Sequence, residues 1–224
     1  MKPIWGLATA IMMSTLLAGA IGAQTQAGAQ KTDMTPQGAA IVAHGTSAGA
    51  VACARCHGFD GLSDSSGAFP ILSNQTADYL SKQLRDFSSG TRLNAIMTPI
   101  AKALKDKEID AVAQYYATVR ATTVPPLARW PDLVKRGETL ATMGDMDRQV
   151  LPCTGCHGQK GIGEPPFTPY LAGQYGPYIV SQMVMFNRGY RKNALMYTEA
   201  HNLAEGDYEA LGAYFEGLPR PSAQ

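Results

Sequence analysis

The stretch "AVACARCHGFDG" at residues 50–61 contains two cysteines separated by two residues, with a histidine directly after the second. The stretch "LPCTGCHGQKG" at residues 151–161 repeats this pattern. The two C-x-x-C-H units contain all four cysteines of the 224-residue chain. A cysteine pair at this spacing can form a disulfide, bind zinc or attach a cofactor. The fold and the function of the chain therefore depend on which of these uses applies.

The histidine distinguishes between the three uses. A disulfide within C-x-x-C is typical of a redox catalyst rather than a structural link. Zinc ribbons place their cysteine pairs much closer than the 100 residues that separate these two units. Only covalent attachment of haem c uses the histidine, because both thiols form thioethers to the porphyrin and the histidine binds its iron. The motifs thus predict two covalently bound haem c groups, attached through Cys53, Cys56 and His57 and through Cys153, Cys156 and His157.

The rest of the chain is also duplicated. "FSSGTRLNAIM" at residues 87–97 and "FNRGYRKNALM" at residues 186–196 are identical at six of eleven positions, at a constant separation of 99 residues. A fixed period of this kind indicates a repeated unit. The same separation relates Gly38 to Gly137, Pro70 to Pro169, Gln75 to Gln174, Tyr79 to Tyr178 and Gln83 to Gln182.

A proline-rich segment separates the two copies. "RATTVPPLARWPDL" at residues 120–133 contains three prolines and no hydrophobic periodicity, which is typical of a stiff connector. We therefore predict a first domain at residues 34–121, a linker at 122–131 and a second domain at 132–221.

Each copy has the periodicity of helices. Apolar residues and Gln83 recur at helical spacing from Tyr79 to Phe87, and Gly90 is a plausible terminator of this helix. A second helical face runs from Ile109 to Tyr116, and the long alternating runs of a sheet protein are missing. The predicted fold class is all-α. Domains of this size have little core of their own, so we expect a cofactor to fill the middle of each.

Each iron requires a further ligand, and methionine sulfur is a common one. Met97 is the only methionine between the first motif and residue 142, whereas the second copy contains Met143, Met146, Met183, Met185 and Met196. A single methionine usually fills a core. Among the five, however, only Met196 aligns with Met97 in the repeat. The prediction is therefore that His57 and Met97 bind one iron, and that His157 and Met196 bind the other.

Two further pairs are candidates for contact with the cofactor. The carbonyls of Pro70 and Pro169 could accept the second ring N–H of each histidine. The simpler alternative is that each proline forms a loop turn and has no role at the haem. Arg92 and Arg191 could pair with haem propionates, which suit a guanidinium, or could be solvated surface charges. Both alternatives stay open for both pairs.

The N-terminus resembles an export signal. An uncharged apolar run from Ile4 to Ile21 follows Lys2 and leads into small residues, which predicts a cleavable signal peptide at residues 1–23. The alternative is an uncleaved membrane anchor. The chain as a whole is 45% hydrophobic and 17% charged, as in ordinary globular proteins, with a formal net charge of +1. Nucleic acid is therefore not an expected partner.

The sequence resembles the dihaem cytochromes c of the cytochrome c4 type. The matching features are "ACARCHG" and "PCTGCHG", each followed by the P-x-L and G-x-R segments and by a C-terminal helix. The resemblance covers nearly all of the mature chain. It implies two tandem class I cytochrome c domains related by a pseudo-twofold axis, with their haems facing each other across the interface. The segment "YTEAHNLAEGD" after Met196 departs from the pattern, because it contains a glycine and lacks the basic residues of the first copy.

The resemblance also implies a function. The expected role is that of a periplasmic one-electron carrier, not an enzyme, between a donor dehydrogenase or quinol-oxidising complex and a terminal oxidase or other acceptor. One alternative is a cytochrome subunit of a membrane dehydrogenase or oxidase, which would associate peripherally with the membrane. A second is a dihaem enzyme of the peroxidase or thiosulfate dehydrogenase type, which would need an open iron or an unusual ligand.

Overall fold

The computed structural model describes residues 35–121 and 130–220. The predicted signal peptide, residues 1–23, and most of the predicted linker, residues 122–131, lie outside the described residues. Within the described ranges, no helix combines the length and the apolar character needed to cross a membrane.

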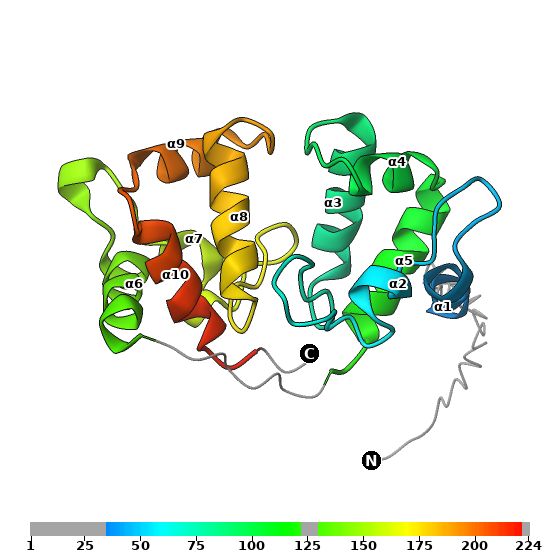
Figure 1. The fold of residues 1–224 in the computed structure, drawn as a ribbon, viewed down its shortest axis with the longest axis horizontal. Coiled ribbons are helices and arrows are strands. Elements are labelled where there is room, and N and C mark those ends of the chain that lie inside the picture. Colours follow the sequence, from blue (N-terminus) through cyan, green and yellow to red (C-terminus); the bar gives the residue numbers. More distant parts are fainter. Residues whose placement is uncertain (1–34, 122–129, 221–224) are drawn as a thin grey trace, which may run out of the picture. The chain divides into compact units, whose positions relative to one another are not determined.

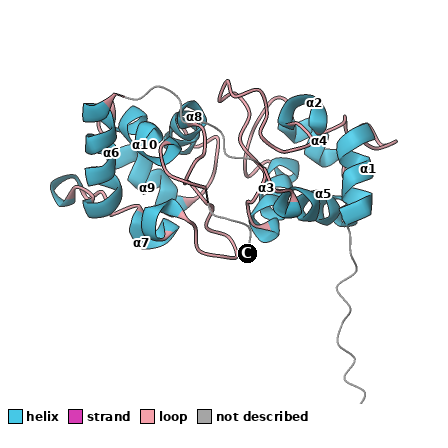
Figure 2. Ribbon diagram, turned by 90° about the horizontal axis from the view of Figure 1, so that it is seen from below, coloured by secondary structure: helices cyan, strands magenta, loops and turns pink. Residues whose placement is uncertain are grey.

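The described residues fold into two similar sets of helices (Figure 1). The first set comprises α1 (Thr35–His44), α2 (Ala54–His57), α3 (Ala77–Ser89), α4 (Met97–Lys102) and α5 (Asp106–Thr118). The second set comprises α6 (Pro131–Met143), α7 (Thr154–His157), α8 (Gly176–Asn187), α9 (Ala194–Asn202) and α10 (Asp207–Glu216), with short 3-10 turns η1 (Met146–Arg148) and η2 (Gln159–Gly161). Extended backbone in this part of the chain pairs only as isolated bridges, and Figure 2 shows helices joined by long loops. The predicted all-α fold is confirmed.

The limits of α3 follow from its sequence. The Thr76 hydroxyl oxygen accepts a hydrogen bond from the Tyr79 backbone N–H at 3.3 Å and so caps the start of the helix. The helix ends at Gly90, whose φ of +81° is the left-handed conformation that glycine adopts without strain. Between these limits Leu80, Gln83 and Phe87 are buried, which is the face that the periodicity predicts.

Two glycines at equivalent positions permit close helix crossings. In the first set α1 packs against α5, and in the second α6 packs against α10. A Cβ atom added at Gly38 would collide with the carbonyl of Ala111, and one added at Gly137 would collide with the carbonyl of Ala210. Because both glycines lie inside helices, their role is close packing and not a turn.

A buried carboxylate joins three segments of the second set. Asp207, at the first position of α10, has no solvent-exposed surface. Its oxygens lie 2.5 Å from Arg136 Nη2 and 2.6 Å from Arg148 Nη1, and they accept the Ala204 N–H at 2.7 Å. Burial raises the pKa of Asp207, but the hydrogen bonds from Arg148, Ala204 and Arg136 outweigh this effect and hold the pKa below its ordinary value.

The glycine crossings can be tested by adding a single methyl group. Gly38→Ala and Gly137→Ala should each lower the free energy of unfolding by about 1–3 kcal/mol, because backbone must move to accommodate the Cβ atom. Gly155→Ala is the matched control, since no heavy atom lies within 4 Å of its added Cβ. Thermal or denaturant unfolding provides the measurement. Equal stabilities for all three variants would contradict the packing role.

The Asp207 cluster predicts a dependence of stability on pH. Asp207→Asn should lower the free energy of unfolding at pH 7 by about 2–3 kcal/mol, because it removes the charge that two arginines surround. A carboxyl whose pKa is lower in the folded state stabilises the fold above its ordinary pKa of 3.8. This stabilisation is lost as the pH falls through the folded-state pKa. The difference from wild type should therefore shrink below about pH 4, whereas the exposed control Glu209→Gln should differ little at any pH.

Candidate functional site

A cavity of about 680 Å³ lies among the described helices. Both C-x-x-C-H units line it, and so do apolar side chains from both sets, including Leu80, Val112, Ile179 and Leu211. The same four residues belong to the two main hydrophobic clusters, one in each set. The cavity is thus an extension of both cores, and an apolar group bound there would complete them.

Each motif forms a short helical turn at the cavity wall. The His57 N–H donates to the Cys53 carbonyl at 3.0 Å, and the His157 N–H donates to the Cys153 carbonyl at 2.8 Å. These turns hold both cysteines and the histidine of each motif at the cavity. Burial raises the pKa of both Cys53 and Cys153 to about 11. Redox-catalytic cysteines have a lowered pKa, so this environment does not suit the disulfide-exchange alternative.

Burial favours the neutral form of both motif histidines. Burial lowers the pKa of His57 to about 4, although the Pro70 carbonyl partly opposes the shift. Burial also lowers the pKa of His157, against the effect of the Pro169 carbonyl. Neutral imidazole is the form that binds metal ions, so the site favours ligation over protonation.

Both proline carbonyls act on their motif histidine, but only the Pro169 carbonyl lies in hydrogen-bond geometry with the imidazole. His157 Nδ1 lies 3.2 Å from the Pro169 carbonyl oxygen, within hydrogen-bonding distance. His57 Nδ1 is buried, and it has no hydrogen-bond partner among the residues that the structure describes. An imidazole that donates from Nδ1 keeps Nε2 free for a metal ion.

The two candidate methionines occupy equivalent positions. Met97 and Met196 both line the cavity and both are partly buried. The Asn94 side-chain oxygen accepts the Met97 N–H at 2.8 Å, and the Asn193 side-chain oxygen accepts the Met196 N–H at 2.9 Å. This role for the asparagines was not expected, although both are identical in the repeat.

The other methionines of the second set differ in whether they reach the cavity. Met183 and Met185 also line the cavity, so its lining alone does not single out Met196. Met143 and Met146 are 69% and 68% exposed and do not line it.

Arg92 and Arg191 come together at the same cavity. Their backbones form an isolated antiparallel bridge, in which the Leu93 N–H donates to the Tyr190 carbonyl at 2.8 Å and the Lys192 N–H donates to the Thr91 carbonyl at 2.9 Å. Each guanidinium also lies over an aromatic ring of its own set, 4.4 Å from the ring centroid of Phe87 or Phe186. The two arginines are therefore structured and not solvated.

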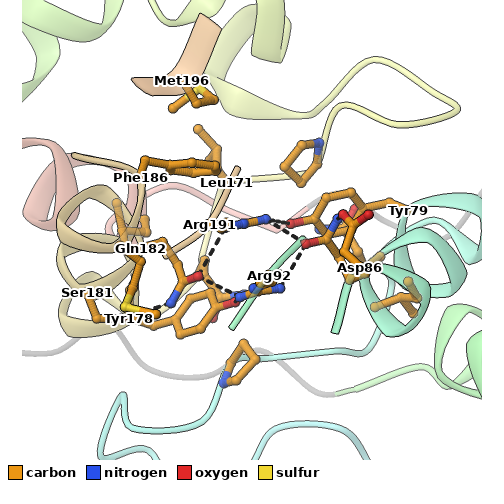
Figure 3. Close-up of a pocket in the computed structure, with 18 of the residues that line it drawn as sticks. Tyr79, Asp86, Arg92, Leu171, Tyr178, Ser181, Gln182, Phe186, Arg191 and Met196 are labelled. Carbon is orange, nitrogen blue, oxygen red and sulfur yellow. Dashed lines mark hydrogen bonds between the residues drawn. The ribbon is translucent and has the colours of Figure 1, made fainter. Parts of the chain in front are cut away.

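The arginine side chains donate mainly to the opposite set, as Figure 3 shows. Arg92 Nη2 donates to the Tyr178 hydroxyl at 2.7 Å and to Gln182 Oε1 at 2.5 Å. Arg191 Nη2 donates to the Tyr79 hydroxyl at 2.7 Å and to Gln83 Oε1 at 2.8 Å. Each arginine also reaches the glutamine of its own set, Gln83 at 2.9 Å and Gln182 at 3.1 Å.

These four acceptors carry no formal charge. Burial lowers the pKa of Arg92, and the positive charge of Arg191 adds to this effect, although Tyr178 and Tyr79 oppose it. Burial acts in the same direction on Arg191, but Tyr79 and Tyr178 outweigh it and raise the pKa of Arg191 above its ordinary value. In the described part of the chain, neither arginine has a carboxylate within 4.0 Å. A negatively charged group at the cavity would relieve the repulsion between them.

The residues present fit two haem c groups. Two cysteine pairs, two neutral histidines and two equivalent methionines surround an apolar cavity, with a pair of cations that haem carboxylates can neutralise.

Known proteins are similar to this chain in sequence. A family model described as cytochrome c matches residues 37–120. The chain is 37% identical to the thiosulfate dehydrogenase electron acceptor of Stutzerimonas stutzeri (strain A1501), over 78% of this chain and 82% of that protein. It is 34% identical to cytochrome c4 of Pseudomonas aeruginosa, over 75% of this chain and 85% of that protein.

A solved structure is similar in both fold and sequence. Reduced recombinant cytochrome c4 from Pseudomonas stutzeri superposes with a TM-score of 0.72 at 32% identity. The match covers 83% of this chain and 98% of that structure, so it includes both sets of helices.

Proposed function

Because the chain belongs to the dihaem cytochromes c of the cytochrome c4 type and carries two covalently bound haem c groups, we propose that it passes single electrons from respiratory-chain donors to a terminal oxidase or another acceptor. The observation that carries this proposal is the cavity, which both C-x-x-C-H units line in equivalent ways. Haem c supplies an iron that alternates between the ferrous and ferric states.

The proposed ligands follow the symmetry of the two sets. Cys53 and Cys56 attach one haem, and His57 and Met97 bind its iron. The second haem has the equivalent residues Cys153, Cys156, His157 and Met196. Two protein ligands on each iron leave no open position for a substrate, which supports a carrier and not an enzyme.

The surrounding residues have three roles in this proposal. Apolar side chains such as Leu80 and Ile179 exclude water from the cavity. The Pro169 carbonyl orients the His157 ring by accepting from Nδ1, and Pro70 has the corresponding position beside His57. Arg92 and Arg191 neutralise the haem propionates while they hold the two sets of helices together.

The proposed organisation places this carrier in the periplasm. A signal peptide at residues 1–23 would direct export, and the two haem domains would extend over residues 34–121 and 132–221 with a linker at 122–131. The match of the cytochrome c family model to residues 37–120 supports the first domain. An export signal also suits haem c, because a thioether protects the cysteines from oxidation to disulfides in an oxidising compartment.

One relative suggests a specific donor. Its name, thiosulfate dehydrogenase electron acceptor, describes a protein that takes electrons from an enzyme of sulfur oxidation. The same role for this chain would make its partner a thiosulfate-oxidising dehydrogenase, either as a transient donor or as the large subunit of a permanent complex.

The methionine ligands can be tested singly. Met97→Ala and Met196→Ala should each remove one sulfur-to-iron charge-transfer band and lower one of the two reduction potentials by on the order of 0.1 V or more, because thioether ligation favours ferrous iron. Absorption spectra and a redox titration provide the measurements.

Two control variants separate ligation from packing. Met183→Leu introduces the residue that the first set has at the equivalent position, Leu84, and should preserve both bands. Met143→Ala changes an exposed side chain and should also preserve both. The ligand assignment fails if Met183→Leu, and not Met196→Ala, removes the second band.

The carrier role can be tested with a donor enzyme. Thiosulfate alone should leave the oxidised protein unchanged, whereas thiosulfate with a catalytic amount of a thiosulfate dehydrogenase should reduce both haems, because only the enzyme has a site for the substrate. Stopped-flow absorption of the haems follows the reaction. Repeated turnover of thiosulfate by this protein alone, with ferricyanide as acceptor, would show that it is an enzyme.

A further inference from the structure

Two glutamines bind backbone of the opposite set in a reciprocal way. The Ile71 N–H donates to Gln174 Oε1 at 2.9 Å, and Gln174 Nε2 donates to the Ile71 carbonyl at 3.0 Å. The Tyr170 N–H donates to Gln75 Oε1 at 3.2 Å, and Gln75 Nε2 donates to the Tyr170 carbonyl at 3.2 Å. Each amide thus satisfies both backbone groups of one residue in the other set. Both glutamines are buried, with 6% of their surface exposed.

The residues that the glutamines hold lie directly after the two prolines. Ile71 follows Pro70, and Tyr170 follows Pro169. In each set the next residue is fixed by its own set, because the Leu72 N–H donates to the Gly61 carbonyl and the Leu171 N–H donates to the Gly161 carbonyl, both at 2.8 Å. The short segment that presents each proline carbonyl is therefore held on one side by its own motif loop and on the other by the opposite glutamine.

We propose that Gln75 and Gln174 are positioning residues, each of which helps to set the reduction potential of the haem in the opposite domain. This inference rests on the proposed function, since it assumes that His57 and His157 are iron ligands. In the second domain the chain of contacts is complete: Gln75 holds Tyr170, and the preceding carbonyl of Pro169 accepts from His157 Nδ1 at 3.2 Å. Gln174 has the same relation to Ile71 and Pro70, next to the buried ring of His57.

The physical link is the basicity of the imidazole. A carbonyl that accepts from Nδ1 makes the ring a stronger donor to iron, which stabilises the ferric state and lowers the potential. A backbone segment that moves by a few tenths of an ångström changes the length of that hydrogen bond. Each glutamine can therefore act on the iron of the other domain without contacting that iron.

The test replaces the amides with side chains of similar length. Gln75→Met removes both hydrogen bonds to Tyr170, so the His157–Pro169 bond should loosen and the potential of the haem at Cys153 and Cys156 should rise. The potential of the haem at Cys53 and Cys56 should not change. Gln174→Met should change only the potential of the haem at Cys53 and Cys56, and by less, because the Pro70 carbonyl acts on the His57 ring without a hydrogen bond to Nδ1. Gln75→Asn, which keeps an amide but is one methylene shorter, should give a smaller rise than Gln75→Met and serves if the methionine variant folds poorly.

Two readouts are needed. A redox titration followed by NMR assigns a potential to each haem through its own methionine methyl resonance. In the reduced protein, Gln75→Met should also increase the hydrogen-exchange rate of the His157 Nδ1 proton roughly tenfold, because two hydrogen bonds that restrain the acceptor are lost. If the glutamine only stabilised the contact between the domains, its loss would leave this exchange rate unchanged.

Tyr175→Phe is the matched control. The Tyr175 hydroxyl donates to the Leu62 carbonyl at 2.5 Å, so this variant removes a neighbouring contact between the same two domains but no hydrogen bond to Ile71 or Tyr170. Both potentials should remain at their wild-type values. If Tyr175→Phe reproduces the shifts, or if each glutamine variant shifts both haems equally, a general loosening of the domain contact is responsible and the inference is wrong.

The outcome also separates this inference from the proposed function. Wild-type protein without two haems, or without two methionine methyl resonances, would contradict the proposed function itself. Unchanged potentials in glutamine variants that keep both resonances would contradict only the role of the glutamines.

Discussion

The structure depends on the covalent attachment of a large apolar ring at each C-x-x-C-H turn. The hydrophobic clusters of the two helix sets are small, and both open onto the same cavity of about 680 Å³. A chain of this kind buries much of its apolar surface against the cofactor. The thioether bonds prevent the cofactor from dissociating, so that this surface stays buried. The helices, the motif histidines and the two methionines whose N–H groups bind asparagine side chains are all arranged around that cavity. Cofactor binding and folding are therefore closely linked.

The contact between the two sets is polar and reciprocal. Arginine, tyrosine and glutamine side chains of each set satisfy groups of the other, while the apolar clusters remain within their own sets. Two guanidinium groups with uncharged partners are an arrangement that anionic haem carboxylates would stabilise. Attachment of the cofactor and association of the domains are therefore expected to support each other.

Much of this arrangement could be predicted from the sequence, because its parts are local or repeated. The haem motifs, the helix from Tyr79 to Phe87 and its end at Gly90 depend on short-range patterns. The rest depends on contacts between distant residues. Gln75 and Gln174 were recognisable as a repeated pair, but only the folded chain shows that each binds the opposite set. The Asp207 cluster could not be predicted either, because its arginines come from α6 and from η1, far away in the sequence.

The reciprocal contacts have the form of an isologous interface, in which two identical surfaces bind each other around a twofold axis. The Tyr79 hydroxyl accepts a hydrogen bond from Arg191 just as the Tyr178 hydroxyl accepts one from Arg92. A single-domain ancestor with these residues would therefore have formed the same hydrogen bonds with a second copy of itself. Gene duplication and fusion would then have converted a homodimer into one chain. Once fused, each copy could accumulate substitutions that a homodimer would have had to tolerate twice, and the two redox centres became free to diverge.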